Sequence, residues 1–319
     1  MDRFIEKMNK YGAQNVPFMF IIDFDMKYPE IHKLSELPAG IKFSAPLLSS
    51  HQTLTSPRIL SIRKTPVSFE RYSDAFANVQ KNIIAGNTYL LNLTFPTLIE
   101  SDWTLEEIYN SSVAKYKLLY HNMFVVFSPE IFVRIHDGII QSFPMKGTID
   151  ASVEDALKIL MTDKKEEAEH NTIVDLIRND LSKVAYNVIV TRYRYIDRIK
   201  TASSELLQVS SEITGSLKPG YEKHLGDIIG EMLPAGSVTG APKLKTVRII
   251  KESENYDRGW YTGIFGVFDG KSLDSGVMIR FIEKEGNNFY FKSGGGITYM
   301  SDPLSEYEEL ISKVYVPVG

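Results

Sequence analysis

The sequence of 319 residues contains no cysteine. This absence excludes a thiol nucleophile, a disulfide framework, and any zinc or iron–sulfur site that is held by cysteine. Histidine is also scarce: the six histidines are scattered, and no two of them have the spacing of paired metal ligands. We therefore expect any bound metal to be held by oxygen ligands, which favours magnesium or calcium.

Excess positive charge and long apolar runs are missing as well. The formal net charge of −4 and the pI near 5.9 give no basic surface, so we expect no nucleic-acid partner. No apolar run approaches the roughly 18 residues of a membrane span, and the first residues carry no secretory pattern. With 43% hydrophobic and 24% charged residues the composition is that of a globular protein. We expect it to be cytoplasmic, with no membrane partner.

The patterns that are present predict an α+β fold. Short runs rich in β-branched and aromatic residues indicate strands, and helical patterns are inserted between them, which favours antiparallel sheets over a doubly wound parallel sheet. We expect a short lead-in over residues 1–67 that packs on the core, a main domain over residues 68–319, and one compact unit overall. The clearest predicted elements are a strand at Phe18–Phe24, a helix at Ser68–Ile84, a strand at Tyr89–Phe95, and a C-terminal meander with strands at Trp260–Phe268, Val277–Glu283 and Phe289–Ser293.

A hairpin with an Asp-Gly turn is predicted to bring a lysine close to a carboxylate. The strands Ile131–Ile135 and Ile139–Phe143 flank this turn, and Asp-Gly is among the strongest two-residue hairpin signals. Counting outward places Glu130 opposite Met145, one residue from Lys146. A shared face for the two side chains requires an extra loop residue or a bulge, a device that is frequent beside active sites. On this pattern alone, a solvated lysine at a strand end is the alternative.

Two helical segments carry paired glutamates. In Glu166–Val184 the apolar stripe carries Glu169 inward, and Glu166 lies three residues before it. An inward carboxylate is costly unless it is paired or binds a cation. The last helix repeats the arrangement with Glu306 and Glu309. These two pairs predict an oxygen-only cation site, although carboxylates near a helix start are also common because they complement the helix dipole.

Two glycine-containing segments require separate interpretations. The run Pro234–Lys243 does not match the phosphate-binding loop, because Pro242 precedes the lysine where that motif needs glycine. The run Ser293–Thr298 ends a predicted strand with three consecutive glycines. Their backbone N–H groups could cradle an anion, and a flexible turn is the alternative.

Together these segments resemble the chorismate-utilising enzymes. This family includes anthranilate synthase, isochorismate and salicylate synthases, and component I of para-aminobenzoate synthase. The resemblance covers about Ser68 to the C-terminus, in the family's order. It implies antiparallel sheets packed as a two-layer core, with helices outside and a deep central cleft. The segments that carry it are Glu169–Leu181, Pro234–Lys243, Ser293–Ile297 and Glu306–Glu309.

Lys146 distinguishes branches within the family. Anthranilate-type members resemble Pro-Ile-Ala-Gly-Thr at this point, whereas the para-aminobenzoate type has Pro-Ile-Lys-Gly-Thr, and this chain has Pro-Met-Lys-Gly-Thr at 144–148. The resemblance therefore implies an aminodeoxychorismate synthase, which replaces the C4 hydroxyl of chorismate with an amino group for para-aminobenzoate and folate synthesis. The alternatives are an anthranilate synthase, an isochorismate or salicylate synthase, and a silent chorismate-binding module.

The resemblance also implies roles for the two residues of the predicted hairpin. Lys146 would attack C2 of chorismate as a free amine while the C4 hydroxyl departs, and ammonia would then enter at C4 and expel the lysine. Glu130 would donate a proton to the leaving hydroxyl. We expect burial near cationic groups or a metal to lower the pKa of Lys146.

The remaining roles concern magnesium and the substrate carboxylates. Magnesium would hold the ring carboxylate of the substrate and counter its charge. The positions that match the family's magnesium ligands are Glu169 and Glu309, with Glu166 and Glu306 as partners through water. The positions that match its substrate contacts are Arg280, Gly294, Gly295, Gly296, Thr239, Gly240, Tyr261 and Thr148.

Two departures affect the expected chemistry. The family usually has a histidine where this chain has Gln208, and glutamine can form hydrogen bonds but cannot shuttle a proton at neutral pH. The missing cysteine also means that the chain cannot itself release ammonia from glutamine by the family's cysteine-dependent chemistry. We therefore expect either free ammonia as substrate or a separate glutamine amidotransferase subunit as partner.

Overall fold

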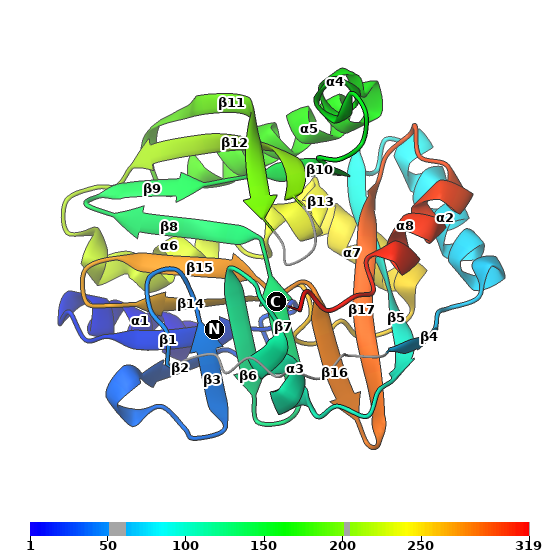
Figure 1. Ribbon diagram of the computed structural model, residues 1–319. Coiled ribbons are helices and arrows are strands. Elements are labelled where there is room, and N and C mark those ends of the chain that lie inside the picture. The colour runs from blue at the N-terminus through cyan, green and yellow to red at the C-terminus, as the bar shows by residue number, and fades with distance from the viewer. Residues whose placement is uncertain (51–61, 201–204, 319) are drawn as a thin grey trace.

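The computed structural model describes residues 1–50, 62–200 and 205–318, and contains two large antiparallel sheets (Figure 1). In the described residues the first sheet has nine strands. Their order across the sheet is β10 (Met145–Asp150), β12 (Glu205–Ser216), β9 (Ile139–Ser142), β8 (Ile131–His136), β15 (Leu273–Val277), β14 (Ile264–Phe268), β1 (Phe18–Ile22) and β2 (Glu30–Lys33), and β11 (Tyr186–Lys200) pairs with β12.

The second sheet has eight strands in the same described ranges. Their order is β13 (Gly240–Ala241), β5 (Leu90–Glu100), β17 (Asn288–Ile297), β16 (Phe281–Glu285), β7 (Phe124–Ser128), β6 (Tyr116–Tyr120) and β3 (Ile41–Ser44), and β4 (Arg63–Thr65) pairs with β5. In Figure 1 the strands of this sheet run across the direction of the first sheet's strands.

Helices lie outside the two sheets (Figure 1). Helices α4 and α5 pack on β10 and β12, helices α2, α7 and α8 pack around β5 and β17, and α3 packs on β6 and β7. The helices are α1 (Asp2–Ala13), α2 (Phe69–Ile84), α3 (Leu105–Ser111), α4 (Ala156–Thr162), α5 (Lys164–Leu181), α6 (Leu225–Glu231), α7 (Lys243–Glu254) and α8 (Pro303–Ser312), with 3-10 turns η1 (Leu34–Glu36), η2 (Tyr221–His224) and η3 (Gly236–Val238).

The hydrophobic core lies between the layers. One cluster joins apolar side chains of the first sheet, such as Ile21 and Phe265, to those of the second, such as Phe43 and Phe281. Further clusters fill the space between each sheet and its helices. The predicted α+β fold with packed antiparallel sheets and outer helices is therefore confirmed. In the described residues, no helix is long and apolar enough to cross a membrane.

Local sequence signals account for several element boundaries. The Ser68 hydroxyl caps α2 by accepting a hydrogen bond from the Arg71 N–H, and Asp302 caps α8 in the same way through Ser305. The predicted hairpin forms with the expected register, since His136 pairs with Ile139. The helix predicted at 166–184 is present as α5, and the paired glutamates lie in its first two turns.

Two predictions about strands are wrong. The run Val277–Glu283 does not form one strand, because β15 ends at Val277 in the first sheet and β16 begins at Phe281 in the second. The hairpin also does not extend to Glu130 and Met145. After β9 the chain leaves β8, and β10 pairs with β12 instead, where Met145 lies opposite Ser210.

The predicted lead-in, residues 1–67, contributes strands to both sheets. Strand β1, predicted as a buried strand at Phe18–Phe24, pairs with β14 in the first sheet, and β3 pairs with β6 in the second. Residues 51–61 of the predicted lead-in lie outside the described residues. The N-terminal segment therefore contributes strands to the core, as well as a helix on its surface.

Candidate functional site

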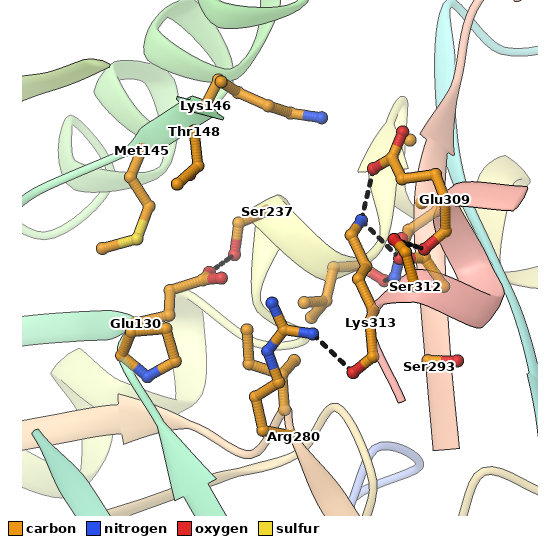
Figure 2. Close-up of a pocket in the computed structure, with 18 of the residues that line it drawn as sticks. Glu130, Met145, Lys146, Thr148, Ser237, Arg280, Ser293, Glu309, Ser312 and Lys313 are labelled. Carbon is orange, nitrogen blue, oxygen red and sulfur yellow. Dashed lines mark hydrogen bonds and ion pairs between the residues drawn. The ribbon is translucent and has the colours of Figure 1, made fainter. Parts of the chain in front are cut away.

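A cavity of about 620 Å³ opens between the two sheets and the first turns of α5 and the last turn of α8. Figure 2 shows Lys146, Glu130, Arg280 and Lys313 reaching into it from different sides. The wall includes Glu130, Met145, Lys146, Gly147, Thr148, Glu166, Gln208, Ser237, Tyr261, Arg280, Ser293, Gly294, Gly295, Gly296, Glu309, Ser312 and Lys313. Most of the residues predicted from separate motifs therefore meet in one place.

Lys146 is directed into the site by an irregularity in β10. The register of β10 against β12 shifts between Lys146 and Thr148, and Gly147 between them has a φ of 66°. The predicted bulge is present, but it lies in the pairing of β10 with β12 and not in a pairing with β8. The Lys146 side chain is only 22% exposed, and its Nζ lies 2.6 Å from Glu169 Oε2. The lysine is therefore held inside the site.

Carboxylates raise the pKa of Lys146 in this structure. Burial alone would lower this pKa, but the ion pair and hydrogen bond with Glu169, together with the nearby charges of Glu166 and Glu309, raise it above its ordinary value. The expected lowering is tied to cationic groups or a metal beside the amine, and for the metal-bound site it stays a prediction. With these carboxylates as its neighbours, the lysine pairs with Glu169.

Glu130 lies at the base of the cavity, beside the junction of the sheets. Its carbonyl oxygen accepts a hydrogen bond from the Val277 N–H at 3.1 Å, which fixes the backbone against β15. Its Oε1 accepts a hydrogen bond from the Ser237 hydroxyl (Figure 2). Burial raises the pKa of the Glu130 carboxyl, although the Ser237 hydroxyl and the charge of Lys146 oppose the rise. A carboxyl with a raised pKa is suited to donate a proton.

Of the four predicted glutamates, Glu166 and Glu309 line the cavity, whereas Glu169 and Glu306 are not among the described residues that do so. Glu169 and Glu306 are 3% and 2% exposed, so their carboxylates are held away from water. An added Cβ at Gly295 would lie 3.4 Å from Glu306 Oε2 and 3.7 Å from Glu309 Oε1, and one at Gly296 would lie 3.5 Å from Glu169 Oε2. The glycine strand therefore runs directly beside three of the carboxylates, and Glu166 lines the cavity near Gly147.

Lysines neutralise these carboxylates. Lys165 Nζ lies 2.6 Å from Glu306 Oε1 and 3.7 Å from Glu169 Oε1, and Lys313 Nζ lies 2.5 Å from Glu309 Oε1. In the part of the chain that is described, no group of three or more acidic or histidine side chains is arranged around a common metal position.

The donor set nevertheless fits a hard cation. Two buried carboxylate oxygens, Glu166 Oε2 and Glu169 Oε1, have no hydrogen-bond partner. A buried acceptor without a donor is costly, and oxygen-only ligands are those that magnesium prefers.

Arg280 and Lys313 form a cationic wall opposite Lys146. Arg280 lies where the chain passes from β15 to β16, with a φ of 52°, and its guanidinium donates a hydrogen bond to the Lys313 carbonyl at 2.7 Å. The Lys313 amine also donates to the Gly294 carbonyl at 2.8 Å. Two cations beside the glycine strand are suited to hold carboxylates of a small anion.

Two of the predicted substrate contacts, Thr239 and Gly240, lie elsewhere. Tyr261 lines the cavity, but Thr239 and Gly240 are not among the described residues that do so. Gly240 pairs with Leu91 of β5, and a Cβ there would lie 1.9 Å from the Leu90 carbonyl oxygen. Close approach of two backbones therefore explains this glycine.

Gln208 lines the cavity beside Thr148. Its amide group donates a hydrogen bond to the Thr148 hydroxyl at 3.0 Å, so a neighbouring strand holds this side chain. Sequence reasoning missed three residues of the site: Ser237, Lys165 and Lys313. The only signal for Lys313 was its position four residues after Glu309, on the same helical face.

Comparisons with known proteins identify the family of the chain. A family model described as chorismate binding enzyme matches residues 21–318. An uncharacterized PabA-like protein of Haemophilus influenzae is 50% identical over 321 residues, covering 100% of this chain and 97% of the relative. Aminodeoxychorismate synthase component 1 of Bacillus subtilis is 30% identical, over 89% of this chain and 62% of that relative. The chain thus spans less than two thirds of the latter protein.

Solved structures support the fold. Anthranilate synthase component I of Streptococcus pneumoniae superposes with a TM-score of 0.65 and 26% identity, over 85% of this chain and 61% of that chain. A menaquinone-specific isochorismate synthase of Escherichia coli has a TM-score of 0.70 at 18% identity, over 98% and 80% of the two chains. At that identity the second likeness concerns the fold alone.

Proposed function

The chain belongs to the family of chorismate-binding enzymes, and from this membership we propose that it is component I of an aminodeoxychorismate synthase. It would convert chorismate and ammonia to 4-amino-4-deoxychorismate. The observation that carries the proposal is the position of Lys146, which projects into the cavity beside the glycine strand, where an added Cβ at Gly296 would lie 2.9 Å from its Nζ. Mere binding of chorismate does not require an amine there.

The proposed reaction has two displacement steps. The Lys146 nitrogen forms a bond to C2 of chorismate, the ring double bond shifts, and the C4–O bond breaks. Glu130 gives its proton to the departing oxygen, which leaves as water. Ammonia then bonds to C4, the double bond shifts back, and the bond between C2 and Lys146 breaks. Attack first requires the Lys146 ammonium to separate from Glu169 and to release one proton to solvent, because only the free amine has the lone pair that bonds to C2.

Magnesium would be held by Glu169 and Glu309, with Glu166 and Glu306 as partners through water. When bound, Mg²⁺ would supply positive charge for the ring carboxylate of the substrate. Glu166 Oε2 and Glu169 Oε1, which accept no hydrogen bond from the described residues, support this assignment. Arg280 and the amides of Gly294, Gly295 and Gly296 would hold the substrate's carboxylates, with Thr148 and Tyr261 lining the pocket.

A separate glutamine amidotransferase would supply ammonia from glutamine. The chain has no cysteine with which to perform that step itself, and the Bacillus relative is named as one component of its synthase. The proposed partner is therefore a cysteine-dependent glutaminase subunit. If added glutaminases never permit activity with glutamine while ammonium salts do, the partnership is wrong.

The test is incubation with chorismate, magnesium and an ammonium salt, with products identified by mass. We expect the native chain to form aminodeoxychorismate and Lys146→Ala to lose this activity. Lys164→Ala is the matched control, because Lys164 is 86% exposed and pairs with Glu167. Equal activity of the native chain and Lys146→Ala would refute the mechanism. Release of pyruvate would indicate an anthranilate synthase. Formation of isochorismate would indicate an enzyme that uses water in place of ammonia. Unchanged chorismate would indicate a module that only binds it.

A further inference from the structure

Ser237 stands between two cavities. On one side it lines the large cavity, where its hydroxyl donates a hydrogen bond to Glu130. On the other side it lines a small cavity of about 20 Å³. That volume can hold a water molecule. The small cavity is lined by Ile131, Phe132, Val133, Ser142, Ile177, Asp180, Leu181, Met232, Gly236 and Ser237.

Asp180 connects the small cavity to the protein surface. Its side chain is 9% exposed and lies beside η3, where an added Cβ at Gly236 would be 3.2 Å from Asp180 Oδ2. Oδ1 lies 2.9 Å from Lys183 Nζ, and Lys183 is 45% exposed. Oδ2 lies 2.5 Å from Lys243 Nζ. A water in the small cavity thus has the Ser237 and Ser142 hydroxyls and the Asp180 carboxylate in its lining as polar partners.

The proposed reaction consumes one proton at Glu130 in every turnover. The proton leaves with the C4 oxygen as water, and the ammonium ion that supplies ammonia releases one proton to the solvent. Glu130 must therefore recover a proton before the next turnover. A path behind Glu130 would deliver this proton without crossing the space that substrate and product occupy.

We propose that Ser237, a water in the small cavity and Asp180 form a proton relay that reprotonates Glu130 from the side opposite the substrate. Ser237 passes its hydroxyl proton to Glu130 Oε1 and takes one from the water. The water takes one from Asp180, which receives it from solvent beside Lys183. No bond other than O–H bonds changes. The relay rests on the proposed function, because it serves Glu130 as the acid of that reaction.

The test compares the first turnover with the steady state in Asp180→Asn, by rapid quench with chorismate, magnesium and ammonium. The relay acts only after Glu130 has given up its first proton, so the first turnover should keep its native rate. Asparagine cannot pass the proton on, so the steady-state kcat should fall roughly tenfold, with the KM for chorismate unchanged. The variant should therefore show a burst of one product per site. Asp175→Asn is the control, because Asp175 lies on the same helix and is 71% exposed.

Gly236→Ala tests the same path without removing a charge. The methyl group would lie 3.2 Å from Asp180 Oδ2 and 3.0 Å from the flexible end of Leu176, at the edge of the small cavity. The same burst and slow steady state are expected. Equal slowing of both phases in either variant, or native kinetics in both, would overturn the relay. A native chain that makes no aminodeoxychorismate would instead refute the proposed function.

Discussion

The buried guanidinium of Arg258 ties the loop that carries Ser237 to the sheets. It donates two hydrogen bonds to Glu254, at 2.6 and 2.9 Å, one to the Val238 carbonyl at 2.9 Å, and one to the Asn92 carbonyl at 2.6 Å. Arg258 and Glu254 are each 2% exposed. This one side chain therefore joins α7, η3 and β5 in the interior.

We predict that Arg258→Met destabilises the protein by about 4 kcal/mol. The substitution keeps the apolar stem but leaves the Glu254 carboxylate buried without its countercharge, and removal of one partner from such a pair typically costs 3–5 kcal/mol. The backbone N–H and hydroxyl of Thr94 still donate to Glu254 Oε1, at 2.8 and 2.9 Å, which keeps the cost within that range.

Urea denaturation followed by fluorescence is the assay, and the transition should move to lower urea by about 1 M. The control is Arg178→Met, which removes a surface pair whose side chains are 55% and 71% exposed and should change stability by less than about 1 kcal/mol. The double variant Glu254→Gln with Arg258→Met should lose less than the sum of the two single losses. A loss below about 1 kcal/mol for Arg258→Met would refute the reasoning.

Three further predictions concern the cavity. Ser237→Ala removes the hydrogen bond that lowers the pKa of Glu130, so the high-pH limb of the first-turnover rate with ammonia should move to higher pH when free ammonia is held constant. Gly296→Ala places a methyl 2.9 Å from Lys146 Nζ and should lower kcat at least roughly tenfold with little change in melting temperature. Glu169→Gln should weaken magnesium binding at least roughly tenfold, measured by calorimetry. The first prediction is contradicted if the high-pH limb of Ser237→Ala stays in place. The second is contradicted by a native kcat for Gly296→Ala, and the third by a native magnesium affinity for Glu169→Gln.

Features that depend on a few neighbouring residues could be predicted from the sequence. The Asp-Gly turn fixed the register in which His136 pairs with Ile139, and the cap residue Ser68 marked the start of α2. The apolar stripe of α5 was enough to direct Glu169 inward, because a helix of that pattern can bury only one face.

Features that depend on distant partners could not be predicted. The strand that holds Lys146 pairs with β12, about sixty residues later, and nothing local to β10 specifies that neighbour. The run Val277–Ile282 is apolar except for Arg280, and it hides the point at which the chain leaves one sheet for the other, since β15 and the first two residues of β16 are buried. The charge state of Lys146 follows from carboxylates of two helices, so only the assembled structure determines it.

The distance in sequence between Lys146 and the other parts of the proposed site has a consequence for biosynthesis. Lys146 stands on β10, whereas the glycine strand β17 and helix α8, with Glu306 and Glu309, are translated last among the parts of the site. A ribosome-bound chain that has produced only the lysine strand lacks the carboxylates and the glycine wall that surround the amine. Reactivity toward chorismate should therefore arise in one step, after α8 has emerged and docked, and nascent fragments should be chemically inert toward it.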